Sequence, residues 1–230
     1  MRHRIALLAL LPALCALAPA AGAQKLDIVD LYREMQVARG AGFPTYEITE
    51  TNGKATASGG ILYGPRARIT LTLDRPRFYL RIDDRGDDDG ASAFITEFVM
   101  WLDREGFPLV GLSERGLKGG VPFAGRVRFY SRASGRWNLV TGEVFPTPDE
   151  TVCGTAHEEI DESTSAWEGL GRAVAVLPRA GTDIAVWCVG PSPKAGTGAL
   201  VEWDRANGRF RNGKALDGPP PWPDVPPPAR

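Results

Sequence analysis

The spacing of apolar residues predicts one helix early in the chain and strands after it. Between Lys25 and Ala38, apolar residues recur mostly at three- and four-residue intervals, the period of an amphipathic helix. Glycines and a proline within positions 40–44 end this pattern. From Tyr46 onwards apolar and polar residues alternate, which is typical of a strand with one buried face.

Alternating segments separated by turn residues predict an antiparallel sheet. Asn52-Gly53 favours a two-residue hairpin turn, with the second strand running toward Tyr63. Residues 69–73 and 78–82 alternate on either side of a turn at 74–76. Further strands are expected at 126–130, 137–144, 173–177 and 184–189, with a last hairpin from 200 to about 214.

Residues 91–104 return to helical spacing, so we expect a helix there that covers one face of the sheet. The glycine-rich stretch 114–125 is expected to be irregular, and a short helix is expected near 165–171. The sequence therefore predicts an α+β fold dominated by antiparallel β structure, with an N-terminal helix, one or two helices packed on the sheet, and one disulfide.

The start of the chain has the pattern of an export signal. Basic residues at positions 2–4 precede an apolar run at 5–17, and Ala21-Gly22-Ala23 provides the small residues that a signal peptidase recognises. Residues 1–23 are therefore predicted to be a signal peptide cut near Ala23. No later stretch approaches the roughly 20 apolar residues of a transmembrane helix, so we expect a periplasmic or secreted protein without a transmembrane segment.

The rest of the chain is predicted to form one domain and a tail. Residues 24–216 suit a single α+β domain, and Pro146 and Pro148 mark a subdivision point near 146–150. Residues 217–230 contain seven prolines and few apolar side chains, which predicts an extended, disordered tail. The alternative is that this tail docks on a partner or on its own domain through Trp222.

Charge and cysteine content limit the partners. The chain has 27 basic and 28 acidic residues, so nothing favours nucleic acid, which requires a basic face. After the leader, two cysteines remain, Cys153 and Cys188. In an exported protein such a pair predicts a disulfide; a free thiol and a metal ligand are the alternatives.

One of the two histidines, His3, lies in the predicted signal peptide. Any catalytic mechanism that needs a histidine must therefore use His157. Zinc sites built on several histidines are excluded, and residues 111–116 miss the nucleophile elbow because Arg115 replaces its second glycine. His157, Glu158 and Glu159 are the catalytic candidates, since neighbouring carboxylates favour the imidazolium form. The plainer interpretation is a solvated acidic loop beside the disulfide.

Five aspartates between positions 83 and 89 form a second acidic cluster, in addition to the one that contains Glu158 and Glu159. Carboxylates are the ligands that Ca²⁺ takes, which makes Asp84, Asp87 and Asp89 candidate metal ligands. Their order does not fit an EF-hand, because Arg85 and Thr96 occupy the first and twelfth loop positions. The plainer use is to cap the helix expected after them.

Residues 130–137 and 203–210 resemble each other and predict two hairpins of one design. Each has an aromatic residue, a turn-forming polar residue, Arg-Ala, a glycine, an arginine and a second aromatic residue. One interpretation is a recognition surface; the plainer one is shared turn chemistry with cross-strand aromatic pairs. The candidate binding residues are Tyr130, Arg136, Trp137, Trp203, Arg209 and Phe210.

Few catalytic motifs occur beside six tryptophans and a proline-rich tail. We therefore expect an exported, non-catalytic protein that binds an envelope partner or ligand, with no cofactor unless Ca²⁺ binds the aspartates. The alternative is a hydrolase of an envelope polymer that uses paired carboxylates from 83–89 and 158–162. That activity requires the two clusters to meet at about 5–10 Å.

Overall fold

The computed structural model of the chain describes residues 26–39, 46–89, 91–132, 135–146, 152, 173–189 and 196–216. Several predictions fall wholly or largely outside these residues: the signal peptide, the subdivision point near 146–150 (of which only Pro146 is described), the short helix at 165–171 and the tail at 217–230. Among the described residues, no helix is both long enough and apolar enough to cross a bilayer.

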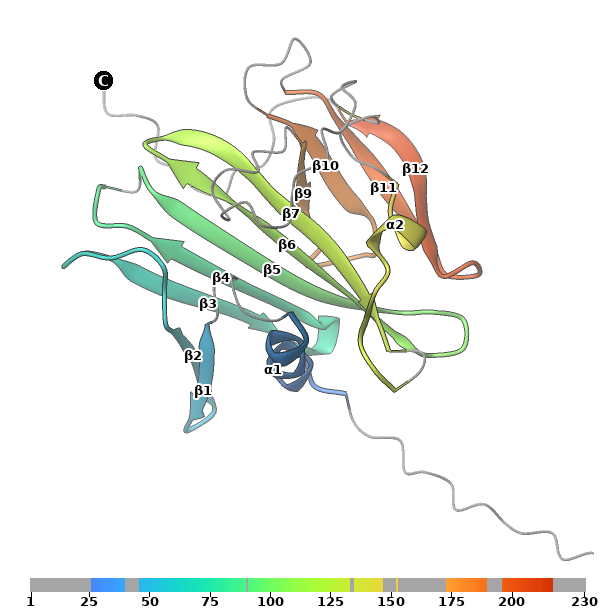
Figure 1. The fold of residues 1–230 in the computed structure, drawn as a ribbon, viewed down its shortest axis with the longest axis horizontal. Helices are drawn as coiled ribbons and strands as arrows, with labels where there is room; N and C mark the ends of the chain where they lie inside the picture. Colours follow the sequence, from blue (N-terminus) through green and yellow to red (C-terminus); the bar gives the residue numbers. More distant parts are fainter. Residues whose placement is uncertain are drawn as a thin grey trace, which may run out of the picture.

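The described structure has three layers around a central antiparallel sheet (Figure 1). In spatial order this sheet contains β3 (Arg68–Asp74), β4 (Tyr79–Arg85), β5 (Ala93–Leu102), β6 (Pro108–Lys118), β7 (Val121–Ser131) and β8 (Asn138–Leu139). A short 3-10 helix, η1 (Arg75–Arg77), connects β3 to β4, and α2 (Thr141–Val144) follows β8. Strands that follow one another in the chain are thus also neighbours in the central sheet, which is a simple antiparallel meander.

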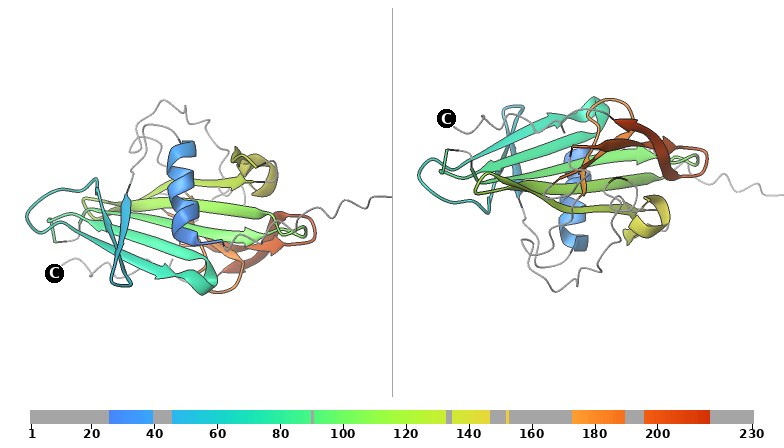
Figure 2. Two further views of the ribbon diagram at one scale, coloured as in Figure 1. Left: turned by 90° about the horizontal axis from the view of Figure 1, so that it is seen from below. Right: turned by 90° about the horizontal axis from the view of Figure 1, so that it is seen from above.

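Different elements cover the two faces of the central sheet, as the two views of Figure 2 show. One face packs against α1 (Ile28–Arg39) and the hairpin of β1 (Glu47–Thr51) and β2 (Lys54–Ser58). The other face packs against a second antiparallel sheet, in the order β12 (Arg209–Leu216), β11 (Gly198–Asp204), β10 (Ile184–Cys188) and β9 (Ala173–Val176). Each face has its own apolar core.

The N-terminal helix is present where the apolar spacing predicts it. The carboxylate of Asp27 accepts a hydrogen bond from the Val29 amide at 2.8 Å, which satisfies one of the free amides at the start of α1. Ile28, Leu31 and Tyr32 are buried on the side that faces the sheet. This 12-residue helix is therefore stabilised mainly by packing of its apolar face against the sheet, because a helix of this length is only marginally stable by itself.

The first hairpin also follows the prediction. Asn52 and Gly53 have φ angles of 52° and 74°, the left-handed pair that a two-residue turn of this kind requires. The second strand, β2, ends at Ser58 rather than continuing toward Tyr63. The strands predicted near 69–73, 78–82, 173–177 and 184–189, and the hairpin near 200–214, correspond to β3, β4, β9, β10 and the β11–β12 pair.

The helix predicted at 91–104 is wrong, because Ala93–Leu102 forms strand β5. This strand is buried on both faces: Ile95, Val99 and Trp101 point one way, and Phe94 and Phe98 the other. A strand covered on both sides does not alternate between apolar and polar residues, so its apolar run resembles a helical stripe.

Two smaller predictions are also wrong. Residues 114–125 are not irregular but belong to the long β6–β7 hairpin, which turns at Gly119 and Gly120 with φ angles of 59° and 76°. A bulge lies beyond Ser113, and a Cβ on Gly125 would lie 2.2 Å from the Glu114 carbonyl oxygen, so the bulge requires glycine. The strand expected at 137–144 is only β8 followed by α2.

The disulfide between Cys153 and Cys188 remains a prediction. Cys188 is fully buried at the end of β10, inside the core between the two sheets. Its proposed partner, Cys153, lies outside the described residues.

An arginine-lined cleft as the candidate functional site

A cavity of about 840 Å³ opens between the central sheet and the end of β9 with the loop that follows it. Among the described residues, its charged lining is mainly cationic, with five arginines and three carboxylates. The charged residues are Arg68, Arg81, Arg85, Arg115, Arg179, Asp83, Glu97 and Asp183. The opposite wall is mostly apolar and runs from Val176 to Ala180. We call this cavity the arginine cleft.

The cleft exists because one sheet face changes character along its strands. At one end, Trp101, Leu109 and Phe129 lie in the core against the second sheet. Further along the same strands, Glu97 of β5 and Arg115 of β6 replace these apolar side chains. Charged side chains cannot be packed into an apolar core without partners, so this end of the face lines a cavity instead.

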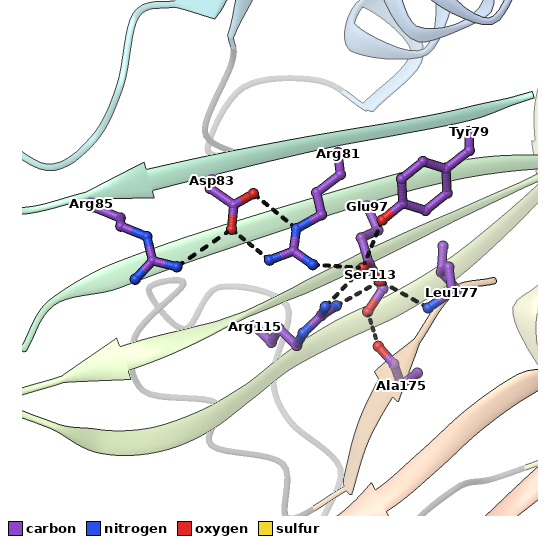
Figure 3. Close-up of polar contacts among 9 residues, drawn as sticks. All are labelled: Tyr79, Arg81, Asp83, Arg85, Glu97, Ser113, Arg115, Ala175 and Leu177. Carbon is purple, nitrogen blue, oxygen red and sulfur yellow. Dashed lines mark hydrogen bonds and ion pairs between the residues drawn. The ribbon is translucent and has the colours of Figure 1, made fainter. Parts of the chain in front are cut away.

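Glu97 is a fully buried charged group of the cleft, and Figure 3 shows its partners. Both guanidinium nitrogens of Arg115 donate to its carboxylate, at 2.7 and 2.8 Å, and the two side chains are each 1% exposed. The Leu177 amide donates to Glu97 Oε2 at 2.8 Å, and the Tyr79 hydroxyl donates to Oε1 at 3.1 Å. The carboxylate is therefore fully engaged.

These contacts fix the protonation states at the bottom of the cleft. Burial alone would raise the pKa of Glu97, but the charge and hydrogen bonds of Arg115 and the Leu177 amide hold that pKa below its ordinary value. Burial, reinforced by the nearby Glu97 charge, raises the pKa of Tyr79 above its ordinary value. At neutral pH Glu97 is thus an anion and Tyr79 a neutral hydrogen-bond donor.

The same region joins the two sheets. Glu97 accepts from Leu177, just after β9, and the Ser113 hydroxyl donates to the Ala175 carbonyl oxygen at 2.5 Å. Both contacts are buried; the first connects a central strand to Leu177 in the wall of the cleft, and the second connects one to Ala175, next to that wall. The polar network at the bottom of the cleft therefore sets the separation of its two walls.

Nearer the opening, Asp83 lies between two arginines of its own strand (Figure 3). Arg81 donates to both oxygens of Asp83, at 2.9 and 2.6 Å, and an Arg85 nitrogen lies 3.9 Å from one of them. Burial alone would lower the pKa of Arg81, but the bonds and charge of Asp83 raise it above its ordinary value. Arg81 therefore stays cationic.

Arg68 adds a further positive charge beside this group. It lies directly opposite Arg85 in the β3–β4 register, and both side chains line the cleft. Arg68 is exposed and forms no ion pair with the described residues. At the other end of the cleft, Arg179 is bound to Asp74 at 3.2 Å. Among the described residues of the lining, the positive charge without an ion-pair partner is therefore that of Arg68.

The first of the two similar segments packs beside α1. Tyr130 is buried in the core under this helix, and its cross-strand partner is Leu139 rather than Trp137. The indole of Trp137 donates to Glu34 of α1 at 3.1 Å. Arg136 is exposed. Only part of this segment is therefore available to a partner.

The second segment lies on the opposite side of the central sheet. Trp203 and Phe210 form the expected cross-strand aromatic pair, with ring centroids 4.8 Å apart, and pack near Trp101 in the other core. Arg209 is exposed. The two groups of candidate binding residues are therefore not brought together on one surface, and their role in recognition stays a prediction.

The aspartate cluster does not converge on one point. Asp84 is fully buried and accepts hydrogen bonds from the Tyr46 hydroxyl at 3.2 Å and the Ile61 amide at 2.7 Å. Asp89 pairs with Arg66 at 3.0 Å. No group of three metal-ligating side chains occurs in the part of the chain that the structure describes, so Asp84, Asp87 and Asp89 form no such group.

Asp88 does not cap a helix, because the element after it is a strand. Instead its carboxylate accepts from the Ser92 amide at 2.9 Å and from the Ser92 hydroxyl at 2.6 Å, which closes the turn into β5. The catalytic candidates His157, Glu158 and Glu159 lie outside the described residues.

The sequence analysis missed the cleft arginines. A usable signal was present: Arg81, Asp83 and Arg85 alternate with the buried Leu80 and Ile82, so that beyond Tyr79 one face of a covered strand carries three charged residues in a row. Comparison of the chain with protein-family models, curated proteins and solved structures finds no match. The cleft itself therefore carries the functional argument.

Proposed function

We propose that the protein is an exported, non-catalytic binding protein of the cell envelope, and that its ligand occupies the arginine cleft. The observation that carries this proposal is the cavity of about 840 Å³ with its fixed charged floor and apolar wall. Ligand sites are typically concave, about 300–1,000 Å³, and combine apolar surface with a few oriented polar groups. The arginine cleft has each of these features.

The protonation states of the cleft favour binding over acid–base catalysis. A general acid needs a pKa raised toward neutrality, whereas the pKa of Glu97 is lowered and its oxygens are occupied. Asp83, the cleft carboxylate from the 83–89 cluster, is held by arginines. The hydrolase alternative also needs residues 158–162, which lie outside the described residues.

Two features of the sequence support an exported location. The first is the predicted signal peptide at 1–23. The second is the predicted disulfide between Cys153 and Cys188, which suits an oxidising compartment. Fractionation of the host cell with an antibody against the mature chain tests this part: the protein should appear in the periplasm or medium, without residues 1–23.

Native mass spectrometry of protein purified from its own host tests the binding proposal. Thr72 lines the cleft, and Thr72→Trp would place an indole in it. Thr56→Trp makes the same change at an exposed position of β2, outside the cleft. We expect a bound small molecule on the wild type and on T56W but not on T72W, with equal folding by circular dichroism. A wild type without ligand, or T72W with as much as the wild type, would contradict the proposal.

A further inference from the structure

We infer that the cleft recognises an organic oxyanion, a phosphate or carboxylate group on a larger molecule, and that Arg68 and Arg85 hold this group between them. The inference rests on the proposed function and makes it more specific. It places the anion at the end of the cleft where β3 begins and β4 ends. It places the rest of the ligand against the apolar wall from Val176 to Ala180.

The first argument is the placement of two like charges. Arg68 and Arg85 are directly opposed on neighbouring strands, with both side chains on the cleft face. Side chains in such positions are close neighbours, and like charges there destabilise a sheet. An anion bound between the two guanidinium groups would make an attractive contact with each of them.

The second argument is the distribution of compensating charge. Arg115 has Glu97 as its partner, and Arg179 has Asp74. Arg81 pairs with Asp83 and lies 3.8 Å from Glu97, and Arg85 lies 3.9 Å from Asp83. Arg68, by contrast, lines the cleft without an ion pair to any described residue. Among the described residues, the unpaired positive charge of the lining therefore lies at Arg68.

The third argument concerns the ligand's chemistry. Guanidinium groups bind phosphate and carboxylate through paired hydrogen bonds, and these bonds are stronger away from bulk water. Arg85 is 15% exposed, and Thr70 and Thr72 add hydroxyl groups to the lining of the cleft. The facing wall at Val176, Leu177 and Pro178 is apolar. This combination suits an anionic group on an organic body rather than a free inorganic ion.

Isothermal titration of the full mature protein tests the inference. The probes are glycerol 3-phosphate and glucuronate as organic anions, inorganic phosphate as the free ion, and glycerol and glucose as neutral counterparts. The variants are Arg68→Gln and Arg85→Gln, with Arg104→Gln as the matched control. Arg104 is exposed in the turn between β5 and β6 and does not line the cleft.

We expect an organic anion to bind more tightly than inorganic phosphate and its neutral counterpart. Loss of one charge-assisted contact should weaken binding by about tenfold or more in R68Q and R85Q. R104Q should bind like the wild type, and added salt should weaken binding. The preference between glycerol 3-phosphate and glucuronate identifies the class of oxyanion.

Stability provides a second measurement. Without ligand, R68Q should melt at the same temperature as the wild type or higher, because Arg68 has no ion pair with a described residue to lose and lies opposite another arginine. Equal binding to R68Q, R85Q and R104Q, preference for a neutral probe, or no anion binding at millimolar concentration would overturn the inference. The T72W comparison separately decides whether the cleft holds any ligand, so failure of the oxyanion assignment is distinguishable from failure of the proposed function.

Discussion

The Glu97→Gln variant tests whether the polar network at the bottom of the cleft holds the two sheets together. Glutamine has nearly the same shape as glutamate but no charge. Arg115, 1% exposed, would then remain buried without its counterion. The amide oxygen of glutamine can still accept from Leu177, so the change removes charge more than hydrogen bonding.

The expected cost follows from that arrangement. Breaking a buried ion pair by neutralising one partner typically costs about 3–5 kcal/mol. Because the Leu177 contact can persist, we expect a loss of about 3 kcal/mol rather than the upper value. Domains are commonly stable by only about 5–15 kcal/mol, so this is a large part of the free energy of unfolding.

Urea unfolding of wild type, E97Q, Arg115→Met and the double variant measures this loss. The double variant should lose less than the sum of the single losses, because neither buried charge then lacks a partner. A loss below about 1 kcal/mol in E97Q, or strict additivity, would refute the reasoning.

The pH dependence gives an independent measure of the same network. The folded pKa of Glu97 lies below its ordinary value of 4.5, so the ion pair stabilises the protein fully above that pH. The contribution is lost as pH falls through the lower folded pKa. The stability gap between wild type and E97Q should therefore be constant from pH 7 to about 5 and shrink in more acidic solution. A gap that does not depend on pH would contradict this assignment.

Three further predictions address the remaining structure. Ser113→Ala leaves the buried Ala175 carbonyl without its hydroxyl donor and should lower the free energy of unfolding by about 1–3 kcal/mol; a variant as stable as wild type in urea would show that this contact is dispensable. A Cβ at Gly111 would lie 2.8 Å from both the Phe129 and Trp101 rings, so Gly111→Ala should cost about 1–3 kcal/mol, whereas Gly142→Ala, with open space around it, should not destabilise; equal melting temperatures would contradict this. The unfolded, unreduced mature protein should show no reactive thiol at Cys153 or Cys188, and reduction should lower stability by about 3–4 kcal/mol; free thiols in the unreduced protein would disprove the disulfide.

The sequence allowed correct prediction of elements that have one apolar, buried face and one polar, exposed face. The α1 helix has one buried stripe, and the β1–β2 hairpin has a turn dipeptide that only a few conformations suit. Strand β5 was misassigned because both of its faces are covered, which removes the period-two signal. The second sheet that covers β5 begins about 70 residues later in the chain, at Ala173. The local sequence pattern cannot show such a contact.

The cleft was hidden from sequence analysis for a related reason. Glu97 was assigned to a helix, and Arg115 was noted only as the residue that breaks a catalytic motif. Their pairing depends on the register of β5 against β6, which places Glu97 opposite Ser113 and two positions from Arg115. Alternating charge in β4 was visible in the sequence, but its significance depends on the wall supplied by residues 176–180.

The most direct test of the central claim is a crystal structure of the protein purified from the envelope of its host. We predict electron density for a bound molecule in the arginine cleft, with an oxyanion group within hydrogen-bond distance of Arg68 and Arg85. An empty cleft with a ligand bound at Trp137 or at the Trp203–Phe210 hairpin would contradict that claim.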